Sequence, residues 1–344
     1  MASPHFPVRE SWLSLYQETP LMPQQVIFDA HHHLWDRPEG RYLVGDLLTD
    51  VQEGHDVRAS LYVQCRTGYL TDGPASLQSV GEVQTIRRWG QATPRYPIGM
   101  VAFADLQLGH RVEPVLEALI DAGAGLVRGI RNSTAYHPNP VFQSNPVPAP
   151  AGLLSTDQFK TGARQVANAG LTLDVWAYHT QLDEVYRLAH AVPGLKVVID
   201  HCGGPLGLGP FALDLGKTFH EWQAAMKRLA ALPNTFVKLG GFGLAVMGHR
   251  YADADKPPSS MTLSENWKPY IQTCIDLFGT DRAMFESNFP VDKGQFSYGV
   301  MWNAFKRIAW DFSQQEQDNL FWRTAARVYQ VDDSVFLKLK EEVV

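Results

Sequence analysis

Short runs of apolar and β-branched residues recur along the chain, and turn-forming residues bound each of them. Runs of this length and composition are typical of buried strands. The eight predicted strands are 26–30, 59–64, 97–103, 126–130, 171–177, 195–200, 234–240 and 282–287. Between them, apolar positions repeat every three or four residues, as in helices that cover a core with one face. The predicted helices are 75–92, 111–123, 158–169, 182–191, 218–232 and 263–278.

Alternating strands and helices predict an α/β fold in which right-handed crossovers join parallel strands. Eight such units favour closure into a (β/α)8 barrel, also called a TIM barrel, over an open doubly wound sheet. No GxGxxG sequence follows the first strand, which disfavours a dinucleotide-binding sheet. Two further helical stretches, 298–310 and 314–330, follow the eighth strand, and we expect both to pack outside the barrel.

The length of 344 residues is compatible with one barrel domain that carries insertions. The predicted parts of a single domain 1–344 are an N-terminal extension 1–25, a barrel core 26–297 and C-terminal helices 298–344. Two connections are longer than a barrel requires, namely 132–157 after the fourth strand and 241–262 after the seventh. Because barrel active sites form at the carboxyl ends of strands, each connection is either an active-site lid or a surface insertion.

The amino-acid composition narrows the classes of molecule that the protein is expected to bind. Hydrophobic residues make up 45% of the chain and charged residues 19%, so the chain can bury a large core. The formal net charge of -6 comes without a Lys or Arg block, which argues against nucleic acid and favours a small-molecule substrate. We find neither a signal-peptide pattern nor a bilayer-spanning run, so we expect no membrane partner and a cytoplasmic location. Three cysteines without a CxxC pair fit a reducing compartment.

Histidines gather at the end of the first predicted strand, in the sequence DAHHHLWD at 29–36. Side chains alternate along a strand, so Asp29, His31 and His33 are expected on one face and His32 on the other. Two imidazoles at the mouth of a barrel could hold a divalent cation or a substrate oxygen. Taken alone, the triplet could equally be a solvent-facing run.

Two more histidines close later strands. His179 follows the fifth strand, and His201 follows the sixth in the sequence IDHCGGP. Either one alone is more often a hydrogen-bonded core residue than a functional one. Four histidines at the same rim of one barrel instead favour an active site.

These motifs resemble the amidohydrolase-2 branch of the amidohydrolase superfamily. DAHHHLWD, GIR at 129–131, IDHCGGP and SNFPVD at 287–292 carry the resemblance, which spans roughly residues 26–330. The branch includes 2-pyrone-4,6-dicarboxylate hydrolase, sugar-acid lactonases and metal-dependent decarboxylases. The resemblance implies that His31, His33 and His179 ligate a divalent metal where one is bound. It also implies that His201 polarises the substrate carbonyl or positions water.

The chain departs from the family at one position. Family members carry an aspartate after the eighth strand as base for the attacking water, and Asn288 stands there instead. An amide does not ionise, so it cannot serve as a general base near neutral pH. Asp292 in the same loop is the first choice for this role. The alternative is that Asp292 caps the N-terminus of a helix or forms a surface ion pair with Lys293. Glu286 shares strand parity with Asn288 and also lies within reach.

Other residues near the inferred rim could bind substrate. Arg131, and less directly Arg128, could clamp a carboxylate, although surface ion pairs are the alternative. Trp176 and Tyr178, together with Trp35 and Phe242, would supply apolar walls or plain packing. Lys238 could add a charge to the pocket or pair with Asp200, and we assign it no role.

The expected reaction is attack of water on the carbonyl of a small lactone, and a carboxylated lactone is the expected substrate. A metal-dependent decarboxylase and a ligand-binding barrel that lost catalysis with Asn288 are the alternatives. Zinc is the metal that three histidines suit best, and a metal-free mechanism is also credible because no carboxylate stands at 288. The sequence offers no surface patch from which to argue a homo-oligomer, which stays an open alternative.

Overall fold

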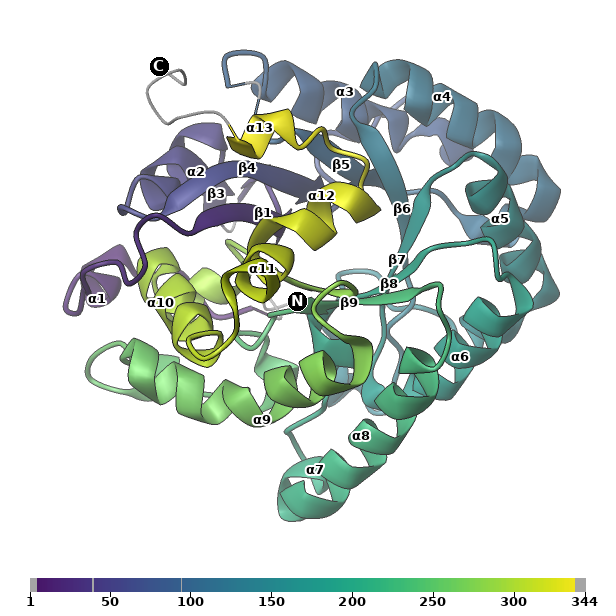
Figure 1. Ribbon diagram of the computed structural model, residues 1–344. Helices are drawn as coiled ribbons and strands as arrows, with labels where there is room; N and C mark the ends of the chain where they lie inside the picture. Colours follow the sequence, from purple (N-terminus) through teal and green to yellow (C-terminus); the bar gives the residue numbers. More distant parts are fainter. Residues whose placement is uncertain (1–4, 39, 94, 338–344) are drawn as a thin grey trace.

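A computed structural model describes residues 5–38, 40–93 and 95–337. Eight parallel strands form one sheet, in which neighbours in space are also neighbours along the chain (Figure 1). The strands are β1 (Val26–His32), β4 (Asp56–Val63), β5 (Gly99–Ala102), β6 (Val127–Ser133), β7 (Thr172–Trp176), β8 (Val197–Ile199), β9 (Thr235–Leu239) and β10 (Ala283–Phe285). Each predicted strand corresponds to one of them, so the (β/α)8 barrel is confirmed.

Helices surround the barrel and bury their apolar faces against the strands (Figure 1). The six predicted helices are found as α3 (Val80–Trp89), α4 (Glu113–Gly123), α5 (Asp157–Asn168), α6 (Leu182–Ala191), α8 (Leu215–Ala230) and α9 (Ser260–Phe278). Side-chain caps fix some of their starts. Thr156 accepts a hydrogen bond from Phe159 N at the start of α5, and Ser259 accepts one from Thr262 N at the start of α9.

Other short elements are absent from the sequence-based prediction. A hairpin of β2 (Trp35–Arg37) and β3 (Gly40–Tyr42), followed by α2 (Val44–Val51), connects β1 to β4. The four-residue helices α1 (Glu10–Leu13) and α7 (Pro210–Leu213) lie outside the repeating units. An element of two turns or fewer offers too few apolar repeats to be recognised by periodicity. No helix among the described residues has the length and apolar character needed to cross a bilayer.

The chain after β10 closes the barrel against β1. Asn288 N donates to His31 O at 2.8 Å, and His33 N donates to Phe289 O at 2.7 Å. These bonds lie at the carboxyl end of β1, beyond the last residue of β10. Closure therefore brings the histidine triplet and the segment 286–292 side by side.

The two C-terminal helical stretches differ in position. Helix α10 (Tyr298–Ile308) packs outside the barrel, mainly against α9, as predicted. The second stretch consists of α11 (Gln314–Asp318), a π-helical turn η10 (Asn319–Arg323), α12 (Thr324–Val328) and α13 (Ser334–Leu337). In Figure 1 it lies across one end of the strands. The predictions for residues 1–4 and 338–344 lie outside the described residues.

The expectation that this second stretch packs outside the barrel wall is wrong. Trp322 and Tyr329 belong to the same buried cluster as Phe28, Leu61 and Met284 of the strands. The Tyr329 hydroxyl reaches into the barrel and donates to Asp174 Oδ2 at 2.7 Å. Helical periodicity shows that a stretch has an apolar face, but it does not show whether that face covers the wall or the end of a barrel.

We predict that Tyr329→Phe lowers the free energy of unfolding by about 1–3 kcal/mol, because a buried carboxylate oxygen loses one of its hydrogen-bond donors. Denaturant or thermal unfolding measures the loss. Tyr186→Phe on α6, where the side chain is only partly buried, is the matched control and should stay within about 0.5 kcal/mol of the parent. Equal effects of both substitutions would contradict this role for Tyr329.

Candidate active site

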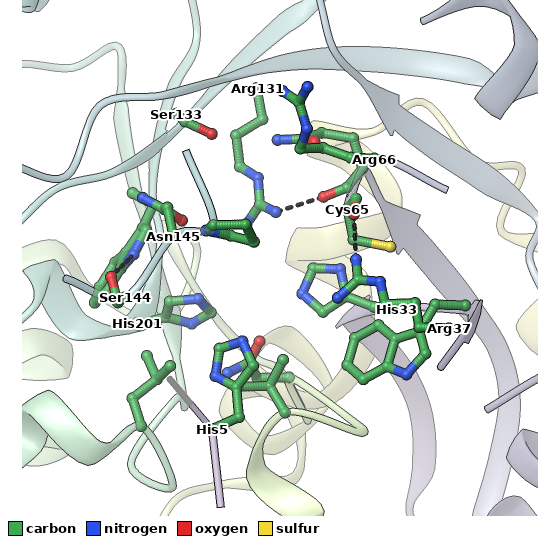
Figure 2. A pocket seen from close by; sticks show the side chains of 17 residues that line it. His5, His33, Arg37, Cys65, Arg66, Arg131, Ser133, Ser144, Asn145 and His201 are labelled. Carbon is green, nitrogen blue, oxygen red and sulfur yellow. Dashed lines mark hydrogen bonds between the residues drawn. The ribbon is translucent and has the colours of Figure 1, made fainter. Parts of the chain in front are cut away.

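A pocket opens at the carboxyl ends of the strands, and its empty space is about 570 Å³ including the opening to solvent (Figure 2). Both long connections contribute to its wall, 132–157 through Ser144 and Asn145 and 241–262 through Leu244. The lining side chains that bear charge or imidazole are those of His5, His33, Arg37, Arg66, Arg131 and His201. The pocket is therefore rich in cationic and hydrogen-bonding groups, and no carboxylate is found among the described residues that line it.

The histidine triplet divides between the two faces of β1. His31 and His33 face one another, with their Nε2 atoms 3.3 Å apart, whereas His32 Nε2 contacts Ser60 Oγ at 2.9 Å on the other face. The predicted alternation is thus confirmed for the histidines. It is wrong for Asp29, whose carboxylate accepts from Tyr298 OH of the outer helix α10 at 3.0 Å. The pairing of β1 with β4 is irregular between Asp29 and His32, and this irregularity breaks the alternation.

Glu286 stands between two of the histidines. Its Oε1 lies 2.7 Å from His201 Nδ1 and also accepts from His201 N at 3.0 Å, and its Oε2 lies 2.8 Å from His31 Nδ1. Burial alone would raise the pKa of Glu286, but the two histidines lower it to about 2, so the carboxylate is ionised. An ionised carboxylate only accepts hydrogen bonds, so His201 carries a proton on Nδ1. Nδ1 of His31 contacts both Glu286 Oε2, at 2.8 Å, and the Lys238 ammonium, at 3.3 Å. In the neutral form of the His201 ring, Nε2 keeps its lone pair.

His33 is held in the same tautomer by the backbone. Its Nδ1 lies 2.7 Å from Val63 O, so Nδ1 carries the proton and Nε2 is the acceptor. Burial is the main reason that the pKa of His31 and of His33 lies well below the usual value. The Nδ1 atoms of His33 and His201 are therefore held by a backbone carbonyl and a carboxylate, and His31 Nδ1 lies against the same carboxylate. Metal-binding histidines in proteins are commonly oriented in this way.

The position of these groups is compatible with a metal ion. Two nitrogens bound to one tetrahedral zinc at about 2.0–2.1 Å lie about 3.3–3.4 Å apart, which is the separation of His31 Nε2 and His33 Nε2. His31, His201 and Glu286 each place one potential ligand atom within 4.8 Å of the others. Among the described residues, this group includes neither His33 nor His179.

His179 occupies a different environment. It is the first residue of a 3₁₀ turn, η5 (His179–Gln181), and its Nδ1 accepts from Leu206 N at 3.1 Å. Its ring packs edge-on against Phe211 at 4.9 Å, and the residue is absent from the pocket lining. The structure thus brings His31, His33 and His201 together and leaves His179 apart. Its role as a metal ligand stays a prediction without geometric support.

A layer of buried charges lies beneath the pocket, inside the barrel. Lys238 Nζ lies 2.7 Å from Asp174 Oδ2 and 3.3 Å from Asp200 Oδ1, and all three side chains are inaccessible to solvent. The sequence-based alternative that Lys238 pairs with Asp200 is confirmed. Arg131 Nη1 joins the layer from above, 3.4 Å from Asp200 Oδ2 and 3.3 Å from His31 Nε2. Arg131 is thereby held with its guanidinium at the pocket floor.

Asn288 and Asp292 form a hydrogen-bonded pair, in which Asp292 lies behind the pocket wall. Asn288 Nδ2 donates to Asp292 Oδ1 at 2.8 Å, and Gly243 N donates to Asp292 Oδ2 at 2.9 Å. Burial raises the pKa of Asp292 to about 7 despite these bonds. Asn288 lines the pocket, whereas Asp292, with both oxygens engaged, does not. Asp292 is therefore placed to orient the amide of Asn288 rather than to contact a substrate.

Two glycines allow the chain after β9 to approach these groups. A Cβ atom on Gly241, which has a φ of +76°, would lie 2.5 Å from the ring of His201. One on Gly240 would lie 2.5 Å from Glu286 Cγ. His201 and Asn288 themselves have positive φ angles of 54° and 55°, a conformation that costs side-chain-bearing residues about 1–3 kcal/mol. The local backbone is thus shaped around the His201–Glu286 contact.

The remaining predicted residues differ in their access to the pocket. Arg131 and Trp176 line it, but Arg128 and Tyr178 do not. Tyr178 and Trp176 instead hold the long connection, because Tyr178 OH and Trp176 Nε1 lie 2.7 Å and 3.0 Å from Ser144 Oγ. Trp35 lines the pocket and stacks on His33, while Phe242 stacks on Trp267 away from it.

Sequence reasoning missed three lining residues that bear a charge or an imidazole. Arg37 lies over the Trp35 ring at 4.5 Å and donates to Cys65 O, and Arg66 lies over the Tyr69 ring at 5.1 Å. His5 reaches the pocket from the N-terminal segment (Figure 2). Arg37 and Arg66 follow the ends of β1 and β4 closely, and a charged residue just beyond a barrel strand was the available signal. No sequence signal pointed to His5.

Comparison with known sequences identifies the family. The amidohydrolase family model, Amidohydro_2, matches residues 28–331. Protein y4mH of Sinorhizobium fredii is 30% identical over 337 residues, which are 90% of this chain and 100% of that protein. An L-rhamnono-gamma-lactonase of Scheffersomyces stipitis is 25% identical over 312 residues, which are 78% of this chain and 87% of that enzyme.

Solved structures share the fold. An amidohydrolase from Burkholderia multivorans with bound zinc superposes with a TM-score of 0.69 at 22% identity, over 89% of this chain and 100% of that one. A 5-carboxyvanillate decarboxylase from Novosphingobium aromaticivorans, complexed with manganese, gives a TM-score of 0.59 at 12% identity, over 92% of this chain and 100% of that one. The barrel and the family model lead to one conclusion: the chain is a hydrolase that belongs to the amidohydrolase family.

Proposed function

We propose that this hydrolase opens a small lactone, with His201 as the general base that activates water. The observation that carries the proposal is the Glu286 carboxylate, which fixes the proton of His201 on Nδ1 and leaves Nε2 free to accept one. His201 lines the pocket, so a water molecule there can reach it. The L-rhamnono-gamma-lactonase among the relatives supports a sugar-acid lactone as the substrate class.

The proton and the electrons balance in two steps. Water adds to the lactone carbonyl as it loses a proton to His201 Nε2, and the carbonyl oxygen takes up the negative charge. Glu286 stabilises the imidazolium that forms, because it is ionised and lies 2.7 Å from Nδ1. When the ring C–O bond breaks, the leaving alkoxide takes the proton back from His201. The products are a carboxylic acid and a hydroxyl on one open chain, and the acid then releases its proton to solvent.

Cationic side chains suit both the transition state and the product. Arg131 is fixed at the pocket floor by Gln64 O at 2.6 Å and by Asp200, so its guanidinium can face the developing oxyanion without rearrangement. Arg37 and Arg66 line the wall nearby (Figure 2). Arginines bind carboxylates through paired N–H groups. Arg37 and Arg66 could therefore bind a carboxylate that the substrate already carries. A carboxylated lactone is therefore the preferred substrate.

A divalent metal fits the same donors. His31 and His33 would hold it through Nε2, with His201 beside them and Glu286 behind the rings, and it would supply Lewis-acid stabilisation of the oxyanion and a more acidic water. Zinc suits imidazole donors best. Arg131 lies 3.3 Å from His31 Nε2 and offers positive charge at the same place without a metal. Decarboxylation on this scaffold would depend on the metal more strictly, because carbanion charge must be stabilised.

The proposed function is tested first on a panel of lactones, with and without a carboxylate substituent. We expect ring opening, which is monitored through the release of acid. We also expect a higher kcat/KM for the carboxylated lactones than for the others. The same assay with carboxylated aromatic acids detects carbon dioxide release, which would identify a decarboxylase instead. Binding without turnover of any panel member, unchanged in Asn288→Asp, would identify a barrel that only binds ligand.

Glu286→Gln should lower kcat/KM by about 10²–10⁴-fold, because an amide no longer enforces the Nδ1–H tautomer of His201. Asp292→Asn is the matched control, a carboxylate-to-amide change in the same loop, and should cost less than about tenfold. Thermal unfolding confirms that both variants are folded. A larger loss in Asp292→Asn than in Glu286→Gln would transfer the base role to Asp292.

Asp292 should make stability depend on pH. Burial raises its pKa from 3.8 to about 7 in the folded protein, so the folded state binds a proton more tightly than the unfolded state does. Its contribution to stability is greatest below pH 3.8 and is lost as pH rises towards 7. Between pH 5 and pH 7 the parent should lose on the order of 2–3 kcal/mol relative to Asp292→Asn. Parallel pH curves for the two proteins would refute the burial argument.

Metal analysis tests whether His31 or His179 is needed to bind a metal ion. We expect the purified protein to contain about one divalent cation per chain, and removal by a chelator to lower lactone turnover. His31→Ala should lose the metal, whereas His179→Ala should keep it, because only His31 belongs to the clustered donors. Metal-free protein with chelator-insensitive turnover would assign the positive charge to Arg131. Loss of metal in His179→Ala would restore the set implied by the family resemblance.

A further inference from the structure

The N-terminal segment 5–13, here called the arm, crosses the carboxyl rim of the barrel. Arg9 Nη2 donates to Ala252 O at 2.5 Å, and Trp12 Nε1 donates to Ala254 O at 2.9 Å. Glu10 forms an ion pair of 2.9 Å with Lys293. The arm is therefore anchored to both connections that follow the last two strands, 241–262 and 286–297.

The first part of the arm lies directly on the segment after β10. A Cβ atom on Gly294 would lie 2.4 Å from Phe6 O and 2.7 Å from Phe6 Cβ, so the contact depends on the absence of a side chain there. Arg250 lies over the Phe6 ring at 5.8 Å. Packing on both sides of Phe6 determines where the preceding residue is placed.

That preceding residue is His5, and its ring lines the pocket. Figure 2 shows it at the pocket mouth near His33 and His201. Burial, and then the positive charge of Arg37, lower the pKa of His5 to about 4. At neutral pH the ring is uncharged and offers one hydrogen-bond donor and one acceptor.

We infer that the arm is a fixed strap over the pocket and that His5 is a substrate-contacting residue that determines specificity. The inference rests on the proposed lactone hydrolysis, and the L-rhamnono-gamma-lactonase among the relatives supports a lactone that carries hydroxyl groups. A neutral imidazole at the mouth can donate to or accept from a sugar hydroxyl on the side of the ligand away from Arg131. Because the strap is anchored outside the pocket, His5 is positioned before substrate arrives, and little ordering cost remains on binding.

The placement of His5 can be tested without any substrate. In the parent, diethylpyrocarbonate should modify His5 about fivefold more slowly than the exposed His220, with sites located by mass spectrometry. Gly294→Ala should raise the His5 rate towards that of His220, because the new Cβ displaces Phe6. Equal rates for His5 and His220 in the parent would overturn the strap, whatever the lactone assays show.

The substrate contact is tested by kinetics on the lactone with the highest kcat/KM. His5→Ala should raise KM about tenfold, the effect of one lost hydrogen bond, while kcat changes less than about threefold. His220→Ala is the control and should leave both constants unchanged. An unchanged KM in His5→Ala would overturn the contact. A protected His5 in a parent that opens no lactone would sustain the strap and refute only the proposed function.

Discussion

The structure depends on burying ionised groups inside the barrel without leaving any of them uncompensated. An isolated charge in such an interior costs several kcal/mol, so each must be paired and hydrogen-bonded. Asp174 and Asp200 share Lys238, and Glu286 is left to two imidazoles. The constraint that keeps the interior stable therefore also places the proton of His201 on Nδ1. Orientation of the proposed general base follows from the same pairing that stabilises the barrel.

The interior is organised in levels along the barrel axis. At the amino end, the C-terminal stretch closes the barrel with Trp322 and Tyr329, and Tyr329 satisfies the lowest carboxylate of the charged layer. Above that layer, His33 and His201 face the pocket. Connections from distant parts of the chain form the wall, and His5 forms part of the mouth (Figure 2). Rigid elements thus hold the reacting groups, whereas irregular segments define the space available to a ligand.

Sequence reasoning succeeded where a periodic pattern determines position. The eight strands and the inward pair His31 and His33 follow from burial and alternation. It failed where the backbone leaves the periodic pattern, because the irregular pairing of β1 turns Asp29 outward. The role of His179, which lies in a 3₁₀ turn outside the clustered donors, stays a prediction. His5 could not be predicted because its place depends on tertiary contacts of the arm, and no repeat in the sequence encodes these.

The exchange of a carboxylate for an amide at position 288 becomes consistent once its neighbours are considered. An aspartate at 288 would place a second carboxylate about as close to Asp292 as the amide nitrogen now lies, at 2.8 Å, and one of the two would have to take up a proton. Asn288 avoids this repulsion because its NH₂ group donates to Asp292. The negative charge that proton transfer requires is instead present at Glu286, behind His201 rather than in the pocket. The pocket thereby keeps a cationic lining, which favours anionic substrates and the carboxylate that the proposed lactone opening would produce.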